Sequence, residues 1–363
     1  KWFAVDYSLN GTDKAQVVVD RSAFESRVNN LTTANYSITD TRKERFTNIP
    51  TVGNDPRPEQ AVLPPNYAYT DVSGQPVYEA EKDLYNGDFS LAYQQVFGGL
   101  DGLLFQFYLA YTAQLNLTES TYQTGRLGYR IFDNYDKFDE ESSSALPPVR
   151  TNQKDYLTGE ELTLRYLSLV HAGQLDTSPH YYAAYAGYFE SMFGGVGAEY
   201  LYRPFDSPLA LGVDINRVKQ REFDQRFSFQ DYSVTTGHVT TYWDTGFQDL
   251  VAKVSAGQYL AGDVGATFDL SRQFNNGTVM GAFFTKTNVS AAEFGEGSFD
   301  KGIYLKIPWE SFMPSTVSGA VNLVYRPLTR DGGAMVVRPV SLFNQTEASS
   351  SRFFEKRPAR LSK

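Results

Sequence analysis

One repeated pattern fills the sequence from about residue 89 to residue 343: roughly ten residues of alternating apolar and small or polar side chains, followed by a turn. The segments 211–216, 239–244 and 266–271 show this alternation clearly. A period of two is that of a β-strand with one apolar and one polar face. Glycine-rich turns such as Asn275-Asn276-Gly277 separate the segments. The pattern therefore predicts consecutive hairpins, and so an antiparallel meander sheet or barrel.

The number and length of the repeated segments narrow this choice. We count about 14 strands, with 12–16 as the accepted range and two or three residues of uncertainty at each end. They lie near 89–97, 103–115, 121–134, 161–172, 180–190, 194–203, 209–221, 235–245, 249–260, 264–274, 278–288, 301–308, 318–328 and 333–343. Globular strands average about five or six residues, whereas a tilted membrane-spanning strand needs about 9–11. The lengths favour an all-β, antiparallel transmembrane barrel over the alternative, a β-sandwich with tyrosine-rich edges.

The connections between the predicted strands are unequal. The longest ones, 135–160, 222–234 and 289–300, follow the third, seventh and eleventh strands and so fall on one rim. Long loops on one rim and short turns on the other are typical of outer-membrane barrels, in which the short turns face the periplasm. An even strand count also returns both termini to the short-turn rim. We therefore expect the loop 135–160 to be exposed at the cell surface and both termini to be periplasmic.

Composition excludes several classes of protein. The 33 basic and 42 acidic residues give a net charge of -9, so nucleic acid is not an expected partner. With no cysteine and three histidines, the chain has no thiolate zinc site and little material for a histidine-built one, and we expect neither a metal nor a cofactor. No apolar run reaches the roughly 18 residues of a membrane helix.

The two ends of the chain differ from the repeating region. Residues 1–30 read as two strands and a short helix over 20–30, the remnant of a small periplasmic α/β domain. Residues 31–88 are polar and rich in proline, and we interpret them as a linker or as a plug segment in or beneath the barrel. The barrel is expected over 89–343 and a polar, basic periplasmic tail over 344–363.

Few residues favour catalysis. His238 and Ser255 lie on the polar phases of neighbouring predicted strands, but no Gly-x-Ser-x-Gly turn accompanies them, and two ordinary lumen residues are the simpler interpretation. The acidic run 133–141 offers oxygen ligands for Ca²⁺, yet its spacing matches no EF-hand loop and a solvated loop is favoured. We expect no catalytic residue and no metal site.

The polar phase of the strands supplies the candidate functional residues. If the apolar phase faces lipid, the polar phase faces a wet lumen of mixed charge, with tyrosines available for stacking on sugars. The residues expected to face lipid are Val239, Trp243, Phe268, Leu270 and Leu323. The lumen candidates are Arg126, Arg130, Arg165, Asp214, Asn216, His238, Tyr242, Asp244, Lys253, Asp269, Asn322 and Arg326, together with Thr240. Whether such a lumen is open, or filled by charges that pair with each other, stays undecided at this point.

Several strings of residues resemble the YjbH/GfcD family. They include Arg130-Ile131-Phe132-Asp133-Asn134-Tyr135, Tyr242-Trp243-Asp244-Thr245-Gly246-Phe247 and Arg326-Pro327-Leu328-Thr329-Arg330-Asp331, and the resemblance extends over about 89–343. Members of that family are outer-membrane β-barrel lipoproteins encoded with exopolysaccharide or group 4 capsule genes, and are predicted to carry two barrels on a longer chain. The resemblance implies that this chain is the carboxy-terminal half, without the first barrel and the lipid-bearing cysteine. It implies no catalytic residue.

These inferences define the expected function: an outer-membrane component of exopolysaccharide or capsule secretion in a Gram-negative bacterium, acting as a conduit or docking platform without catalysis. The alternatives are a general diffusion porin, a closed barrel that anchors periplasmic partners and, less favoured, a lipid-modifying barrel enzyme. The expected partners are outer-membrane lipid and lipopolysaccharide, the exopolysaccharide, polysaccharide-export proteins of the periplasm or outer membrane, and the N-terminal half of the same chain. The negative net charge slightly favours a neutral or basic glycan.

Overall fold

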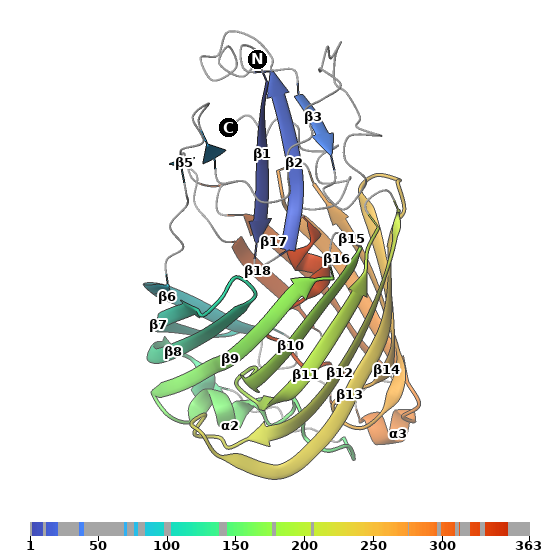
Figure 1. Cartoon of the computed structure of the whole chain (residues 1–363). Helices are drawn as coiled ribbons and strands as arrows, with labels where there is room; N and C mark the ends of the chain where they lie inside the picture. Colours follow the sequence, from blue (N-terminus) through green and yellow to red (C-terminus); the bar gives the residue numbers. More distant parts are fainter. Residues whose placement is uncertain are drawn as a thin grey trace.

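The computed structural model describes most of the chain from residue 84 onward and five strands before it. The described residues are 2–9, 12–20, 36–39, 69–70, 76–78, 84–97, 103–137, 144–175, 179–204, 207–274, 276–295, 299–308, 312, 320–326 and 331–347. They form three antiparallel sheets (Figure 1). Apart from Asp20, the helix predicted over 20–30 lies outside these residues.

Two of the sheets are small and precede the repeating region. The first contains β1 (Trp2–Leu9), β2 (Thr12–Asp20) and β3 (Tyr36–Thr39), in that order. The second pairs β4 (Tyr69–Thr70) with β5 (Pro76–Tyr78). The two strands expected in residues 1–30 are present, and the segment interpreted as a linker contributes β3, β4 and β5.

The main sheet contains thirteen antiparallel strands, each hydrogen-bonded to the next in the sequence. They are β6 (Tyr85–Phe97), β7 (Leu103–Asn116), β8 (Thr121–Asp133), β9 (Leu162–Gln174), β10 (His180–Tyr188), β11 (Phe193–Tyr202), β12 (Leu209–Arg221), β13 (Phe229–Asp244), β14 (Leu250–Gln258), β15 (Val264–Gln273), β16 (Val279–Thr287), β17 (Asp300–Pro308) and β18 (Ala320–Tyr325). Each overlaps one of the first thirteen predicted segments. The all-β, antiparallel fold class is therefore confirmed, and the strand number lies within the predicted range.

Helices are few and short in the described part of the chain. They are the 3-10 helix η1 (Tyr135–Lys137) and the α-helices α2 (Gln153–Thr158), α3 (Ala291–Phe294) and α4 (Leu342–Gln345). Helix α3 begins with a capping box, in which Ser290 and Glu293 bond each other's backbone amides. Among the described residues, none of the helices has the length and apolar character that crossing a bilayer requires.

The main sheet curls around an interior (Figure 1). We call its concave side the interior and its convex side the outer face. The edge strands β6 and β18 approach each other within 8 Å between Cα atoms, but in the described residues no hydrogen-bonded ladder joins them. The predicted closed barrel of 14 strands is therefore wrong for this part of the chain, because the segment 333–343 adds no strand between these edges.

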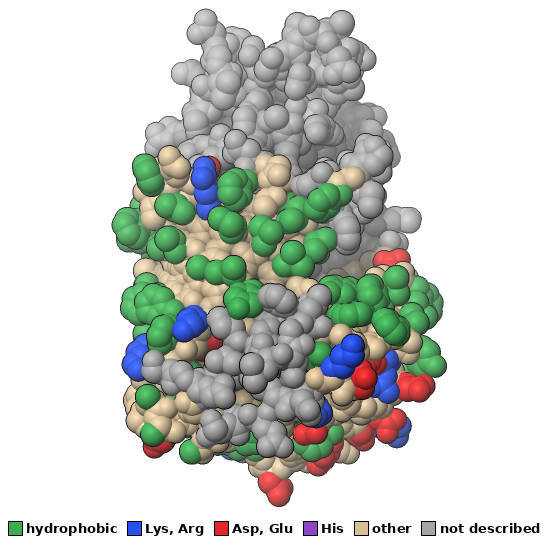
Figure 2. Space-filling view, turned by 180° about the vertical axis from the view of Figure 1, so that it is seen from behind, with side chains coloured by type: hydrophobic (Ala, Val, Ile, Leu, Met, Phe, Trp, Pro, Cys, Tyr) green, Lys and Arg blue, Asp and Glu red, His purple; other side chains and the backbone are tan. Residues whose placement is uncertain are grey.

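The polarity of the main sheet is the inverse of that of a soluble protein, with apolar side chains on the outer face and polar side chains in the interior. Along β12, Val213 and Ile215 are exposed on the outer face, whereas Asp214 and Asn216 are buried in the interior. The strands β13 to β15 follow the same alternation: Val239, Trp243, Phe268 and Leu270 are exposed, and Thr240 is buried. Figure 2 shows hydrophobic side chains gathered over the middle of the outer face, with acidic and basic side chains toward one end.

The C-terminal segment, residues 331–347, runs through this interior. At one rim, Gly333 donates its amide hydrogen to Asp263 and Leu260 donates to the carbonyl of Ala334; both partners lie in the β14–β15 turn. At the other rim, the guanidinium of Arg203, just after β11, donates to the carbonyl of Phe343. Connections after β11 and after β14 lie on opposite rims of an antiparallel meander. The segment thus crosses the interior from rim to rim, and residues 344–347, expected to begin a tail, belong to it.

We call the rim that carries the β8–β9, β10–β11, β12–β13, β14–β15 and β16–β17 connections the long-loop rim, and the opposite one the short-turn rim. Part of the β8–β9 connection folds inward at the long-loop rim. Val149 is fully buried, and Tyr156 of α2 is buried with its hydroxyl donating to the carbonyl of Arg221. The expectation that the loop 135–160 is exposed is therefore wrong for Val149 and Tyr156, because these residues pack into the opening of the sheet; the location of the loop at the cell surface stays a prediction.

Candidate functional site in the interior

The polar-phase candidates lie at three depths. Arg165, Asp214, Asn216, His238 and Tyr242 are buried in the interior, as is Thr240. The half-buried ones are Arg126, Arg130, Asp244, Lys253 and Asp269. Asn322 and Arg326 are exposed on or beside the edge strand β18, where Leu323 is also exposed.

A cluster of charges lies at the middle of the C-terminal segment. The guanidinium of Arg338 is 3.2 Å from a carboxylate oxygen of Glu199 and 3.3 Å from one of Asp214. Glu199 on β11 and Asp214 on β12 are direct cross-strand partners, and their side chains are only 2% and 8% exposed. Two like charges placed opposite each other destabilise a sheet, and buried charges need partners. Arg338 therefore supplies the cation that this pair of strands requires. We call these three residues the Arg338 cluster.

Neutral donors complete the Arg338 cluster. The amide of Asn216 donates to Asp214 at 2.9 Å, and the backbone N–H of Leu342 donates to Glu199 at 3.1 Å. An arginine guanidinium does not lose its proton in a protein, so Arg338 is charged at any pH at which the protein is folded.

Aromatic packing fixes the end of the C-terminal segment. The ring of Phe343 stacks on Tyr242 with 3.8 Å between centroids and 6° between planes. The guanidinium of Arg203 lies 4.2 Å from the centroid of the Phe343 ring and donates to the Phe343 carbonyl at 2.7 Å. The face of Tyr242 is therefore covered by the protein's own chain.

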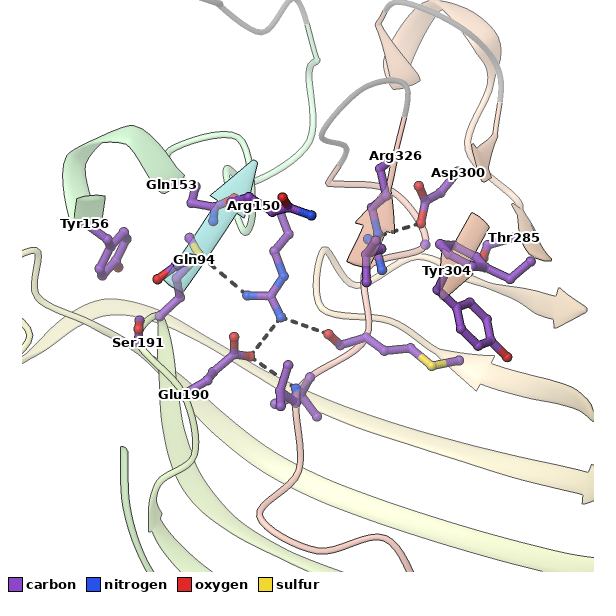
Figure 3. Close-up of a pocket in the computed structure, with 18 of the residues that line it drawn as sticks. Gln94, Arg150, Gln153, Tyr156, Glu190, Ser191, Thr285, Asp300, Tyr304 and Arg326 are labelled. Carbon is purple, nitrogen blue, oxygen red and sulfur yellow. Dashed lines mark hydrogen bonds and ion pairs between the residues drawn. The ribbon is translucent and has the colours of Figure 1, made fainter. Parts of the chain in front are cut away.

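The beginning of the C-terminal segment is held by the β8–β9 connection. Asp331 accepts hydrogen bonds from the backbone N–H groups of Arg150 and Thr151 at 2.8 and 3.1 Å, and from the Thr151 hydroxyl at 2.8 Å. The side chain of Arg150 donates to Glu190 and to the carbonyl of Met335, both at 2.8 Å (Figure 3). These bonds tie the two segments together inside the long-loop rim.

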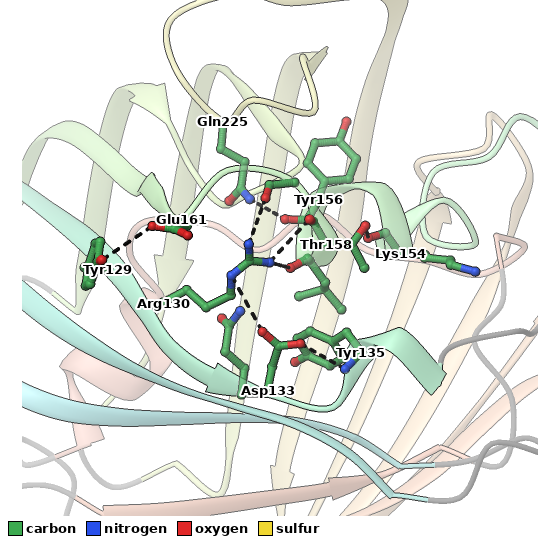
Figure 4. A network of polar contacts seen from close by, with 12 residues as sticks. Tyr129, Arg130, Asp133, Tyr135, Lys154, Tyr156, Thr158, Glu161 and Gln225 are labelled. Carbon is green, nitrogen blue, oxygen red and sulfur yellow. Dashed lines mark hydrogen bonds and ion pairs between the residues drawn. The ribbon is translucent and has the colours of Figure 1, made fainter.

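Arg130, a lumen candidate, has a structural role instead. Its guanidinium donates to the carbonyls of Leu157, Thr158 and Gly159 and lies 3.6 Å from Asp133 (Figure 4). The last carbonyls of a helix lack partners within the helix, and a basic side chain can satisfy them. Arg130 therefore anchors the end of α2 to β8.

The structure does not assemble a Ser–His pair. His238 contacts Asp214 at 3.7 Å through Nδ1, while its Nε2 has no hydrogen-bond partner among the described residues. The Ser255 hydroxyl accepts a hydrogen bond from Thr240 at 3.0 Å. A nucleophile needs a base within hydrogen-bond reach, and His238 and Ser255 do not meet that condition here. In the described part of the chain, no cluster of three or more His, Asp or Glu side chains is arranged to hold a metal ion.

Beside the C-terminal segment the interior contains a cavity of about 590 Å³. Its wall comes from the strands β6, β9 and β14 to β18, from the β8–β9, β10–β11 and β12–β13 connections and from the C-terminal segment itself. The charged residues that line it are Arg150, Arg165, Glu190, Lys253, Asp269, Asp300 and Arg326. Gln94, Gln153 and Tyr304 add amides and an aromatic ring (Figure 3). The candidates Arg165, Lys253, Asp269 and Arg326 therefore meet in one cavity, whereas Asp214, Asn216, His238 and Tyr242 surround the C-terminal segment.

Several residues of the site were not among the candidates. Glu199 lies on the polar phase of a predicted strand, a signal that was available. Arg338 lies within the last predicted strand, Glu190 is the last residue of the predicted strand 180–190, and Asp331 lies in a predicted turn. Nothing local in the sequence indicates that Glu190 and Asp331 bond segments up to 181 positions away.

Comparison with known proteins gives two results. Residues 12–348 match the model of the YjbH family, described as "Exopolysaccharide biosynthesis protein YbjH". A curated relative from Escherichia coli strain K12, named "Uncharacterized lipoprotein YjbH", is 41% identical over 271 residues. The match covers 72% of this chain and 38% of the relative, so the chain spans less than half the length of that relative. The chain therefore belongs to the YjbH family of exopolysaccharide biosynthesis proteins.

Proposed function

We propose that the main sheet lies in the outer membrane of a Gram-negative bacterium and takes part in exopolysaccharide secretion. The inverted polarity of the sheet carries this proposal. Ile215 and Val239 are 58% and 51% exposed, whereas their neighbours Asp214 and Thr240 are 8% and 5% exposed. Soluble monomers rarely expose an apolar surface larger than a few hundred Å². Apolar residues outside and polar residues inside are the arrangement of a membrane barrel.

Strand length and family membership support the same location. β12 has 13 residues and β13 has 16, more than the roughly 9–11 residues with which a tilted strand spans a bilayer. The family description refers to exopolysaccharide biosynthesis, and the curated relative is a lipoprotein. By analogy with outer-membrane barrels, the long-loop rim faces the cell exterior and the short-turn rim the periplasm.

The C-terminal segment determines how a polysaccharide could pass. Because residues 331–347 cross the interior, we propose that they act as a plug and that transport requires their displacement. A general diffusion porin is disfavoured, since such a porin needs a permanent aqueous passage. We propose no chemical step, because the only nucleophile–base pair considered, Ser255 and His238, does not meet in hydrogen-bond geometry.

A second candidate function is a plugged sheet that anchors periplasmic partners and transports nothing. The many bonds of the C-terminal segment favour it, in particular the Arg338 cluster and the Phe343–Tyr242 stack. A segment held this firmly gives a rigid interior. The two candidates differ in one consequence: only the conduit needs the segment to move.

A crosslinking experiment distinguishes the conduit from the anchor. Residues 1–363 contain no cysteine, so in this part of the protein a short bismaleimide can join only the two introduced cysteines of the Tyr242→Cys, Phe343→Cys double variant, in cells that secrete the polysaccharide. The matched control, Thr240→Cys with Ser255→Cys, joins two neighbouring strands and leaves the plug free. For a conduit, secretion falls after the first crosslink and persists after the second. Undiminished secretion with a complete first crosslink would overturn the conduit in favour of the anchor.

The membrane location has its own test. We expect the chain to sediment with outer-membrane vesicles in a density gradient and to resist extraction by sodium carbonate, as an integral membrane protein does. Extraction into the soluble fraction would refute the membrane location, and normal secretion in a strain that lacks the protein would refute the role in secretion.

A further inference from the structure

The cavity beside the C-terminal segment has the size of a ligand site. Its volume of about 590 Å³ lies within the range of about 300–1,000 Å³ found for small-molecule pockets. Amides of Gln94 and Gln153 and the ring of Tyr304 line it together with charged groups (Figure 3). Such a lining offers hydrogen bonds for hydroxyl groups and an aromatic face for a sugar ring.

The carboxylates that line the cavity already have partners. Glu190 accepts from Arg150 at 2.8 Å and from the backbone N–H of Val337 at 3.2 Å. Asp269 accepts from the Tyr304 hydroxyl at 2.9 Å. The Asp300 carboxylate lies 3.5 Å from the guanidinium of Arg326. These groups are therefore engaged by the protein itself.

Two cations of the lining, Arg165 and Lys253, have no carboxylate in direct contact among the described residues. The guanidinium of Arg165 donates to the amide oxygens of Gln94 and Gln106 at 3.1 and 2.5 Å, and both acceptors are neutral. The ammonium of Lys253 has no hydrogen bond and no ion pair within 4.0 Å among the described residues; it lies 5.8 Å from the centroid of the Tyr242 ring and interacts only at longer range with Asp269, its cross-strand partner. No carboxylate oxygen of the described residues lies within 4.0 Å of either cation.

Charge therefore distinguishes the cavity from the rest of the chain. Four cations and three carboxylates line it, which leaves one net positive charge, whereas the whole chain carries -9. Keeping a partly desolvated cation without an anionic partner costs free energy. An anion supplied by a ligand would offset this cost.

From this net positive charge we propose that the cavity binds a sugar residue that carries a carboxylate, such as a uronic acid within an oligosaccharide. Arg165 and Lys253 supply the positive charge that favours the carboxylate, the glutamine amides bond hydroxyl groups and the Tyr304 ring packs on the sugar. Only the identification of the ligand as a segment of the secreted polysaccharide rests on the proposed function. This proposal differs from the expectation based on the whole chain. The negative net charge favoured a neutral or basic glycan, whereas the positive charge of the cavity favours an acidic sugar.

The test measures binding to the purified full chain in detergent by calorimetry, with trigalacturonate as the acidic probe and maltotriose as the neutral one. We expect trigalacturonate to bind at least about tenfold more tightly, because hydrogen bonds to charged groups are stronger than neutral ones. The Lys253→Met variant should lose about tenfold or more in affinity for trigalacturonate and leave the affinity for maltotriose unchanged.

The matched control is Lys219→Met, which removes the same charge from the exposed outer face of β12 and should change neither affinity. If Lys253→Met does not fold, Arg165→Gln takes its place and predicts the same selective loss. Equal affinity for the two probes, absence of trigalacturonate binding or an equal loss in Lys219→Met would overturn the proposal. Because the purified chain is measured, a negative result here leaves the secretion experiments unaffected, and failure of those experiments leaves this one interpretable.

Discussion

The Arg338→Ala substitution tests how the C-terminal segment is held. It removes the cation that lies between Glu199 and Asp214 and leaves two carboxylates, 2% and 8% exposed, next to each other in the interior. Breaking a buried ion pair by removing one partner costs about 3–5 kcal/mol. The two carboxylates regain water when the segment leaves. The cost therefore falls on docking of the segment rather than on the strands that carry the carboxylates.

This loss of docking free energy predicts how much more often the C-terminal segment opens. Since about 1.4 kcal/mol corresponds to a factor of ten, 3–5 kcal/mol raises the population of the opened segment by roughly two to three and a half powers of ten. Hydrogen exchange measures that population through amides protected by docking. The amides of Gly333 and Val337 are suitable, because they donate to Asp263 and Glu190 and not to the Arg338 cluster.

The control removes an arginine whose ion pair is exposed. The side chains of Arg226 and Glu160 are 64% and 49% exposed, and such pairs contribute about 0–1 kcal/mol. Exchange at Gly333 and Val337 should therefore be nearly unchanged in Arg226→Ala. Unchanged exchange in Arg338→Ala would refute the ionic docking of the segment. An equal acceleration throughout β12 would show that the cluster stabilises the whole sheet instead.

Three further predictions concern the C-terminal segment, the β14–β15 turn that holds it and the outer face of the sheet. Phe343→Leu keeps an apolar side chain but loses the stack on Tyr242, and should weaken docking of the segment by about 1 kcal/mol, measured as faster amide exchange in 331–347; unchanged exchange would contradict the role of the stack. Burial raises the pKa of Asp263 despite the hydrogen bond from Gly333, so the protonated form is favoured in the folded state, and its stabilising contribution is complete at acid pH and lost as pH rises through the raised pKa. Asp263→Asn keeps an acceptor for Gly333 and should increase the midpoint of urea unfolding at pH 7 more than at pH 4, whereas an equal increase at both would refute the burial argument. Leu270→Arg should lower the free energy of unfolding in lipid vesicles by about 2–4 kcal/mol if the position lies near mid-membrane, and a negligible loss of stability would place it outside the bilayer core.

Strand positions were the most predictable part of the fold. Each strand that faces two environments must alternate, so the period of two is written into the sequence itself. β12 spans the predicted residues 209–221, and β6 begins only four residues before the predicted start at 89. β13 begins at Phe229, six residues before the predicted start at 235, because its first residues have the polar composition that is typical of a loop.

The C-terminal segment could not be predicted in the same way. The run Met335-Val336-Val337 after Gly332-Gly333 has the local signature of another hairpin strand. Whether it pairs with an edge or enters the interior depends on partners far away in the sequence, such as Glu199, which accepts the Leu342 amide across 143 positions. Local periodicity contains no information on such a pairing.

The candidate site was predictable only in part for a related reason. Alternation identified interior residues such as Asp214 and Arg165, but not which of them keep a free charge. That depends on Arg338, which neutralises Asp214, and on Gln94 and Gln106, which offer Arg165 only neutral oxygens. The function of an interior charge is thus set by the segments that enter the sheet.

The most direct test of the account is the alternation of environment along β13 in a lipid bilayer. Spin labels placed singly from His238 to Trp243 in the chain reconstituted into vesicles report access to oxygen, which concentrates in lipid, and to a water-soluble nickel chelate. We predict high oxygen access at positions 239, 241 and 243, which are exposed on the outer face, and low oxygen access at 238, 240 and 242, which are buried. High access to the nickel chelate at the outer positions would show that water, and not lipid, surrounds the sheet, and would contradict the account.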